Sequence, residues 1–252
     1  MTSDYYDELA PFYKLMYVDW EKSVQRQAVM LDGILKDHAG TKVTTVLDVS
    51  CGIGTQSIGL AQLGYQVCAS DLSPAEVEMA RQEAMNHGVD IEFRVGDMRD
   101  AWGIYEQQFD CVISCDNSIP HLLNNADILR ALRQFHQCVK SGGCCLISVR
   151  DYAKLGPPQA QISFNPRLVH DVGGERVVLF DLWKNEGDLY EMSTYIVQDR
   201  GEGDIQTRVV HGGKYYRVSI DTLCELFTRA GFSNVAVLHD RFFQPVIFAY
   251  KS

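Results

Sequence analysis

The 252-residue chain is 46% hydrophobic and 22% charged, which is typical of a globular protein that buries one core, or one core and a smaller appendage. Its formal net charge of −10 comes without a basic stripe or a polybasic run, and this argues against nucleic-acid or membrane partners. The longest apolar runs have the length of strands, and residues 1–8 are polar and acidic. We therefore expect neither a membrane span nor a secretory leader, and we predict a cytoplasmic protein.

The eight cysteines form no C-x-x-C pair and no Cys/His zinc pattern. Most lie in apolar, strand-like runs, where a free thiol behaves as a small hydrophobic group. These positions indicate a reducing compartment and no structural zinc, and we expect no metal site.

In chain order, apolar residues at helical spacing over residues 5–33 predict one or two N-terminal helices. Short β-branched runs then alternate with helical segments, as in βαβ units on a parallel sheet. Ser73, Pro74 and Glu76 form the capped start of one such helix, and Gly142-Gly143 is expected to end another. The five strands predicted in this region are residues 43–49, 66–70, 91–95, 109–114 and 144–149.

Residues 160–218 change character. Runs such as 177–183, 190–197 and 207–210 alternate apolar and polar residues, and turn sequences at 185–188 and 201–204 join them, which predicts antiparallel strands. A capped helix at 221–230 and strands at 235–238 and 246–250 then return to the first pattern.

The predicted fold class is α/β, with a Rossmann-like, mostly parallel seven-stranded sheet, helices on both faces, an N-terminal helical lid and an antiparallel β insertion. Four units are expected: the lid at residues 1–40, the cofactor-binding core at 41–151, the insertion that roofs the substrate at 152–218, and the remaining helix and two strands of the core at 219–252.

Polar residues follow every predicted strand of the core. Ligands bind outside the carboxyl ends of the strands in an open parallel sheet, so five such positions along one edge suggest a ligand with several hydrogen-bonding parts. The positions are Asp48 with its glycine loop, Asp71, Asp97, Asp116-Asn117 and Arg150-Asp151.

The glycine loop indicates which ligand this is. Gly52 and Gly54 allow a sharp turn and a close backbone approach, although Ser57 at the third position makes the glycines weak evidence for a dinucleotide site. Asp48 is badly placed for a pyrophosphate but suits a cofactor with an ammonium group. Asp71 stands at the separation from Gly52 that is expected of a carboxylate binding ribose hydroxyls.

A nucleobase would complete this ligand. Asp97 can accept a hydrogen bond from an adenine amino group while Met98 packs on the ring. Two simpler roles stay open: Asp97 as a turn former, and Met98 as a core residue.

Residues 46–54, Val-Leu-Asp-Val-Ser-Cys-Gly-Ile-Gly, resemble the glycine-rich motif of class I S-adenosylmethionine-dependent methyltransferases, and residues 71, 96–99 and 109–110 fall where later motifs of that family fall. Ser50 stands where the family usually has glycine. The resemblance implies S-adenosylmethionine as cofactor, S-adenosylhomocysteine as product, and a carboxylate on the ribose at Asp71 and near adenine at Asp97. The expected cofactor residues are Asp48, Ser50, Gly52, Gly54, Asp71, Leu72, Asp97, Met98 and Asp116.

The stretches 116–122 and 149–152 resemble glycine and sarcosine N-methyltransferases. This resemblance implies that Asn117 and Arg150 contact an amino-acid substrate, with the arginine holding its carboxylate, and that Tyr195 supplies an active-site hydroxyl. An internal ion pair of Arg150 with Asp151 is the alternative. His121 either lines the cofactor site, shuttles the released proton, or caps a turn.

Three N-terminal tyrosines are expected either to cover the cofactor or to lie in the core; they are Tyr5, Tyr6 and Tyr13.

The favoured function is in-line methyl transfer to the nitrogen of a small amine, such as a glycine-like amino acid, with a carboxylate-bearing amine as the acceptor. Such a transfer depends mainly on alignment and needs no metal. The alternatives are O-methylation of a small metabolite and a non-catalytic protein that binds S-adenosylmethionine. Whether the protein forms a homo-oligomer is left open by the sequence.

Overall fold

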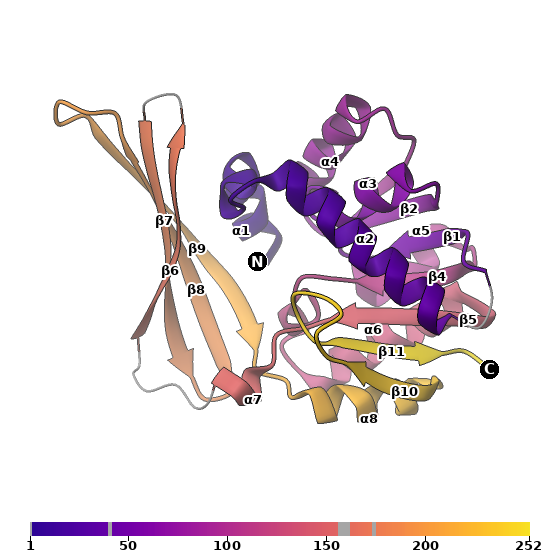
Figure 1. Ribbon diagram of the computed structural model, residues 1–252. Coiled ribbons are helices and arrows are strands. Elements are labelled where there is room, and N and C mark those ends of the chain that lie inside the picture. The colour runs from indigo at the N-terminus through magenta and orange to yellow at the C-terminus, as the bar shows by residue number, and fades with distance from the viewer. Residues whose placement is uncertain (1, 40–41, 156–161, 173–174) are drawn as a thin grey trace.

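The predicted seven-stranded sheet is present in the computed structural model, which describes residues 2–39, 42–155, 162–172 and 175–252 (Figure 1). Its strand order is β10-β11-β5-β4-β1-β2-β3, and only β11 runs antiparallel to its neighbours. The order reverses between β1 and β4, which are adjacent and both parallel. The strands are β1 (Thr45–Asp48), β2 (Gln66–Asp71), β3 (Glu92–Val95), β4 (Phe109–Ser114), β5 (Val139–Ser148), β10 (Ser233–Leu238) and β11 (Val246–Tyr250).

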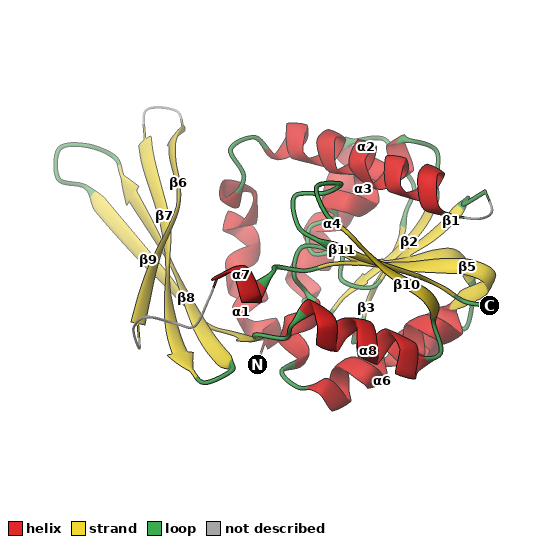
Figure 2. Ribbon diagram, turned by 60° about the horizontal axis from the view of Figure 1, so that its bottom comes forward, coloured by secondary structure: helices red, strands yellow, loops and turns green. Residues whose placement is uncertain are grey.

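Helices cover both faces of this sheet (Figure 2). Neighbouring strand residues point to opposite faces, so Val46 packs in one apolar core and Leu47 in the other. The first core lies under α2 (Trp20–His38), α3 (Thr55–Gln62) and α4 (Pro74–Asn86), and the second under α5 (Ala101–Tyr105), α6 (Asn125–Cys138) and α8 (Ile220–Ala230). No helix within the described residues is long and apolar enough to cross a membrane.

The insertion forms a separate four-stranded antiparallel sheet beside the core (Figure 1). Its strands are β6 (Ile162–Val172), β7 (Glu175–Glu186), β8 (Leu189–Asp199) and β9 (Ile205–Tyr216), and the short helix α7 (Tyr152–Leu155) precedes them. Helix α1 (Thr2–Leu9), followed by the 3-10 segment η1 (Ala10–Met16), lies between this sheet and the core. The buried Tyr5 hydroxyl of α1 lies 2.8 Å from the Thr194 hydroxyl of β8 and so ties the lid to the insertion. The fold class is confirmed, whereas the unit limits at residues 40, 151 and 218 stay predictions.

Two local expectations had opposite outcomes. Ser73 caps α4 by accepting from the Glu76 amide, with Pro74 as the first helical residue, as predicted. In contrast, α6 ends at Cys138, and Gly142-Gly143 lie inside β5. The helix ends earlier because Val139 is already extended and pairs with Phe109, while the two glycines exchange backbone hydrogen bonds with Lys251.

Candidate functional site

A cavity of about 650 Å³ opens at the carboxyl ends of β1, β2 and β4, beside the point where the strand order reverses. This is where open parallel sheets bind ligands, and the volume suits a small molecule. Its walls come from the loops after β1 to β4, from the lid and from β9. Of the predicted site residues, those on the wall are Ser50, Gly52, Asp71, Leu72, Asp97, Met98, Asp116 and His121.

The glycine loop is tightly folded. Gly52 and Gly54 have positive φ angles of +51° and +89°, and a Cβ on Gly54 would lie 2.9 Å from the Ile58 side chain. The Gly52 amide donates to Asp71 Oδ2 at 2.9 Å, which joins this loop to the end of β2. The Ser50 hydroxyl lies 2.8 Å from that of Ser114, which joins it to β4.

Asp48 lies behind this loop, outside the residues that line the cavity. It is fully buried, and it accepts hydrogen bonds from the Ser50 amide at 3.2 Å and the Ser57 hydroxyl at 2.7 Å. Burial raises the pKa of Asp48 to about 7, against the effect of these two donors. In the structure, Asp48 stabilises the glycine loop through these two hydrogen bonds. A contact between Asp48 and a cofactor ammonium group stays a prediction.

Asp71 faces the cavity with donors already on both oxygens. The Gly52 and Ser73 amides donate to it at 2.9 and 3.0 Å, and burial raises its pKa despite them. Asp7 of the lid accepts from the Ser73 hydroxyl at 2.6 Å and the Ala75 amide at 3.1 Å. The lid is therefore attached to the helix that begins beside Asp71.

A further carboxylate on this wall escaped the sequence analysis. Its residue, Glu76, belongs to the predicted helix cap, but the side chain is 2% exposed and lines the cavity, and its Oε1 has no hydrogen-bond partner within the ranges that the structure describes. Burial, together with Asp71, raises its pKa well above the usual value. A buried acceptor without a donor is costly, and ribose hydroxyls would supply donors here. The residues present thus fit an adenosyl cofactor.

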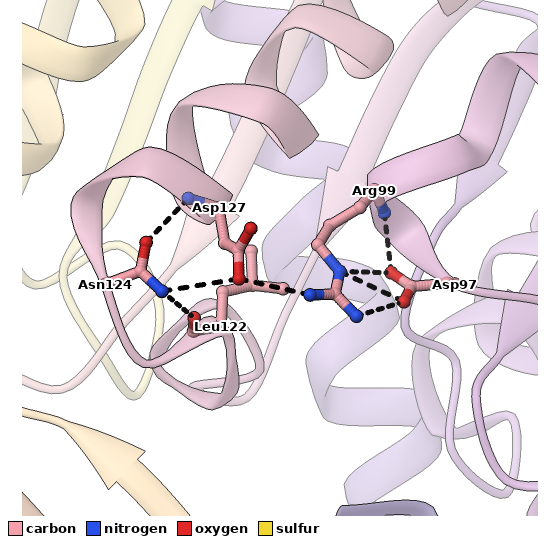
Figure 3. Close-up of polar contacts among 5 residues, drawn as sticks. All are labelled: Asp97, Arg99, Leu122, Asn124 and Asp127. Carbon is pink, nitrogen blue, oxygen red and sulfur yellow. Dashed lines mark hydrogen bonds and ion pairs between the residues drawn. The ribbon is translucent and has the colours of Figure 1, made fainter.

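Asp97 is engaged by an arginine that the sequence analysis had not considered (Figure 3). Arg99 donates to its carboxylate through Nε at 3.0 Å and through Nη2 at 2.6 Å, and also reaches Asp127 at 3.1 Å. Burial alone would raise the pKa of Asp97, but Arg99 outweighs it and holds the pKa below its usual value. Asp97 caps the 3-10 turn η2 (Met98–Asp100), so its turn-forming role is real, and adenine would have to share this carboxylate.

Another part of the cavity wall holds a hydrogen-bonded chain. His121 Nδ1 lies 2.8 Å from the Lys214 carbonyl, which can only accept, so Nδ1 carries the proton and Nε2 is a bare acceptor. The Tyr6 hydroxyl, 2.7 Å from Nε2, therefore donates to it, and the Tyr215 hydroxyl lies 3.0 Å from Tyr6. Burial lowers the pKa of His121 to about 4.

Tyr6 and Tyr13 of the lid line the cavity, whereas Tyr5 is a core residue.

The turn after β4 is strained. Asp116 and Asn117 have consecutive positive φ angles of 56° and 66°, a conformation that is costly outside glycine and tends to occur at functional sites. Asp116 lines the cavity. Asn117 is buried behind the wall, where its side chain accepts from the Arg150 amide at 3.0 Å and donates to the Tyr152 hydroxyl at 2.8 Å.

Arg150 does not form the alternative ion pair with Asp151, whose carboxylate instead contacts Lys154 at 3.5 Å. The Arg150 guanidinium lies 5.1 Å from the centre of the Trp183 ring, with Nη1 3.5 Å from the Tyr190 hydroxyl. This position is behind the cavity wall rather than on it. A substrate contact stays a prediction.

The structure does not bring Tyr195 to the cavity. Thr194, the preceding residue of β8, points toward the lid, so Tyr195 points to the other face of the sheet, where its ring stacks on Phe180 at 4.8 Å. The tyrosines that the insertion contributes near the site are Tyr190 and Tyr215. Strict alternation along β8, in which residues 190, 192, 194 and 196 are buried, was the signal that could have separated them.

Cys51 and Cys115 line the cavity, and burial raises the pKa of both thiols, so neither is a ready nucleophile. Within the described part of the chain, no group of three or more His, Cys, Asp or Glu residues is arranged to hold a metal ion.

Comparison with known proteins identifies the core. Residues 46–143 match the family described as a methyltransferase domain. The chain is 29% identical over 138 residues to a glycine/sarcosine N-methyltransferase of Parasynechococcus marenigrum, covering 55% of this chain and 48% of the relative. It is 31% identical over 146 residues to a ubiquinone biosynthesis O-methyltransferase of Xanthomonas euvesicatoria pv. vesicatoria, covering 56% and 59%. The chain thus spans about half to three-fifths of the length of these curated relatives.

The whole fold has solved counterparts. The crystal structure of DesVI from Streptomyces venezuelae superposes with a TM-score of 0.81 at 20% identity, and the match covers 96% of this chain and 98% of DesVI. The four-stranded insertion is therefore part of a shared architecture. Residues 46–143 therefore carry a methyltransferase domain, and this match and the shared fold support a class I S-adenosylmethionine-dependent methyltransferase.

Proposed function

We propose that this protein transfers the methyl group of S-adenosylmethionine to the nitrogen of a small amine that carries an anionic group. The observation that carries the proposal is the cavity itself, which joins the cofactor loops to a polar end whose hydrogen-bonding groups include an imidazole with a lowered pKa. The activity, the acceptor and the role of each site residue are all part of the proposal.

The division of the cavity suggests how the residues act. Asp71 and Glu76 would hold the ribose, Asp97 and Met98 would face the adenine, and the loop held by Asp48 would face the amino-acid end. The cofactor, when bound, supplies an electrophilic methyl group. The polar end around His121 would then receive the acceptor.

The weakness of the base favours nitrogen over oxygen. A hydroxyl acceptor needs a base that removes its proton during the transfer, and an imidazole with a pKa of about 4 is poorly matched to that task near pH 7. An amine that enters in its neutral form already has a free lone pair. The Tyr6–His121 chain can then orient the acceptor by hydrogen bonding, and alignment supplies most of the rate enhancement.

Arg150 supports an anionic acceptor. Its guanidinium has no carboxylate partner in the described residues, and its backbone amide donates to Asn117, which follows Asp116 of the cavity wall. The name of the glycine/sarcosine N-methyltransferase relative fits such an acceptor. The O-methyltransferase relative keeps hydroxyl acceptors as the second candidate.

The test is a methyl-transfer screen with S-adenosylmethionine that carries a deuterated methyl group. Matched pairs of acceptors, an amine and its hydroxyl counterpart, would each be offered with and without a carboxylate or phosphate group. Mass spectrometry should find the label on the nitrogen of anionic amines. Label on hydroxyl compounds alone would establish the O-methyltransferase candidate instead.

A further inference from the structure

A second cluster of cationic and aromatic side chains lies between the core and the insertion. Arg217 follows β9, and its guanidinium lies 5.0 Å from the centre of the Tyr190 ring and 6.0 Å from that of Trp183. The Trp183 and Tyr190 rings stack at 4.5 Å, and Arg150 lies over the same Trp183 ring. Two guanidinium groups therefore share one aromatic platform.

This cluster has donors without acceptors. Arg217 Nε and Trp183 Nε1 are both buried, and neither has a hydrogen-bond partner among the described residues. Arg217 Nη2 donates to the neutral Asn185 side chain at 2.6 Å, and the Arg150 guanidinium has a hydroxyl, that of Tyr190 at 3.5 Å, as its hydrogen-bond partner in the described part of the chain. Buried N–H groups that lack acceptors are costly.

No carboxylate neutralises the two arginines. None lies within 4.0 Å of either guanidinium in the described residues, where Asp151 is engaged by Lys154. The residues outside the described ranges contain no Asp or Glu, so the rest of the chain cannot supply one. In a chain with 33 acidic and 23 basic residues, two adjacent unpaired arginines are a specific feature of this site rather than a consequence of composition.

The cluster adjoins the cavity through one side chain. The Tyr215 ring stacks on Tyr190 at 4.9 Å, and its hydroxyl lies 3.0 Å from that of Tyr6 on the cavity wall. Asn117, which binds the Arg150 amide, follows Asp116 of the same wall. The cluster is thus linked to the polar end of the cavity by the Tyr215 and Asn117 side chains, both of which are buried.

We infer that Arg150, Arg217 and Trp183 form a binding site for a dianionic group of phosphate-ester type on the methyl acceptor. One arginine satisfies a carboxylate through a planar, bidentate contact. Two guanidinium groups and an indole N–H that offer donors from different residues match the several oxygens and two charges of a phosphate better. Anion binding by these three residues does not depend on which reaction the protein catalyses. The assignment of the bound anion to the methyl acceptor rests on the proposed function.

The test uses inorganic phosphate as the probe on the full chain saturated with S-adenosylhomocysteine, at constant ionic strength in chloride. The chain has three tryptophans, so the indole N–H region of a ¹⁵N NMR spectrum is simple, and Trp183→Phe assigns the peak. Phosphate should shift the Trp183 indole proton downfield in a saturable way, and acetate should bind about tenfold more weakly. The Trp20 indole, which already donates to Thr55 at 2.9 Å, should not move.

Arg217→Gln and Arg150→Gln should each weaken phosphate binding by about tenfold or more. Arg208→Gln is the matched control, because Arg208 also lies over a ring, that of Phe12 at 5.2 Å, but outside the cluster. If Arg217→Gln does not fold, Arg217→Lys replaces it and should still weaken binding several-fold, because the second donor nitrogen is lost. A Trp183 resonance that ignores phosphate, equal affinity for acetate, or an Arg217 variant that binds like the control would each overturn the inference.

The methyl-transfer screen separates this inference from the proposed function. Phosphate binding without any labelled amine would contradict the proposed reaction while the anion site stands. Labelling of amines that lack a phosphate, together with a silent Trp183 resonance, would overturn the anion site alone.

Discussion

Replacement of Asp71 by asparagine tests the ribose assignment at the end of β2. The carboxylate accepts the Gly52 and Ser73 amides at 2.9 and 3.0 Å and faces the cavity. Asparagine keeps the shape but loses the charge, and its NH₂ group must face one of these N–H donors. A hydrogen bond to a charged group contributes about 1.5–3 kcal/mol, so loss of the charge-assisted ribose contacts should weaken S-adenosylhomocysteine binding by about 2 kcal/mol, or roughly 30-fold in Kd.

Calorimetric titration of the folded variant measures this loss, and Asp110→Asn is the matched control. Asp110 also accepts backbone amides, from Thr44 at 2.9 Å and Thr45 at 2.8 Å, but it lies at the amino end of β4, on the opposite edge of the sheet. Both variants should melt at lower temperature, whereas only Asp71→Asn should lose affinity. Equal Kd values for the two variants, within about threefold, would refute the ribose assignment.

Four further outcomes are expected. Asp48 has a folded pKa of about 7, above the usual 3.8 of a free aspartate, so its stabilising contribution is fully present below 3.8 and is lost as pH rises to 7; Asp48→Asn should flatten the fall in melting temperature between pH 4 and 7, and an unchanged slope would contradict the burial argument. The pKa of His121 is lowered from 6.5 to about 4, so NMR at pH 6 should find a neutral ring with its proton on Nδ1. Protonation of this ring should destabilise the fold as pH falls from 6.5 toward 4, and an NMR titration midpoint near 6.5 would contradict the burial of His121. Arg150→Gln should reduce kcat/KM for an anionic amine by about 30-fold with S-adenosylhomocysteine affinity unchanged, and a loss confined to the cofactor would contradict the acceptor role. Activity should survive exhaustive chelation, and restoration by one divalent ion after its loss would favour metal-assisted chemistry instead.

The pattern of strands and their polar ends was predictable because it depends on short-range signals. Apolar runs place the strands, and the residue after each run falls at the ligand edge, as Asp71 and Asp116 do. Whether such a residue reaches the cavity depends on side-chain partners that no spacing reveals. Asp48 turns back to Ser57, and Asp97 is engaged by Arg99 two residues away.

The insertion shows a different limit. Its strands and turns follow from alternation, but a shift of one residue moves a side chain to the other face, and the structure places Tyr195 on the face of β8 that points away from the lid. Glu76 and Arg217 could not be predicted as site residues, because what marks them is a buried polar atom without a hydrogen-bond partner in the described residues. The sequence contains the residues, but only the packed structure shows that Glu76 Oε1 and Arg217 Nε are buried without a bond.

A crystal structure of the complex with S-adenosylhomocysteine tests the central claim most directly, since the cavity, the cofactor and its orientation are all determined at once. The ribose hydroxyls should lie within hydrogen-bond distance of Asp71 and Glu76, with the adenine beside Asp97 and Met98 and the sulfur directed toward the end that holds Tyr6 and His121. An adenine at the Tyr6–His121 end, or a ligand that leaves Glu76 without a donor, would contradict this account of the site.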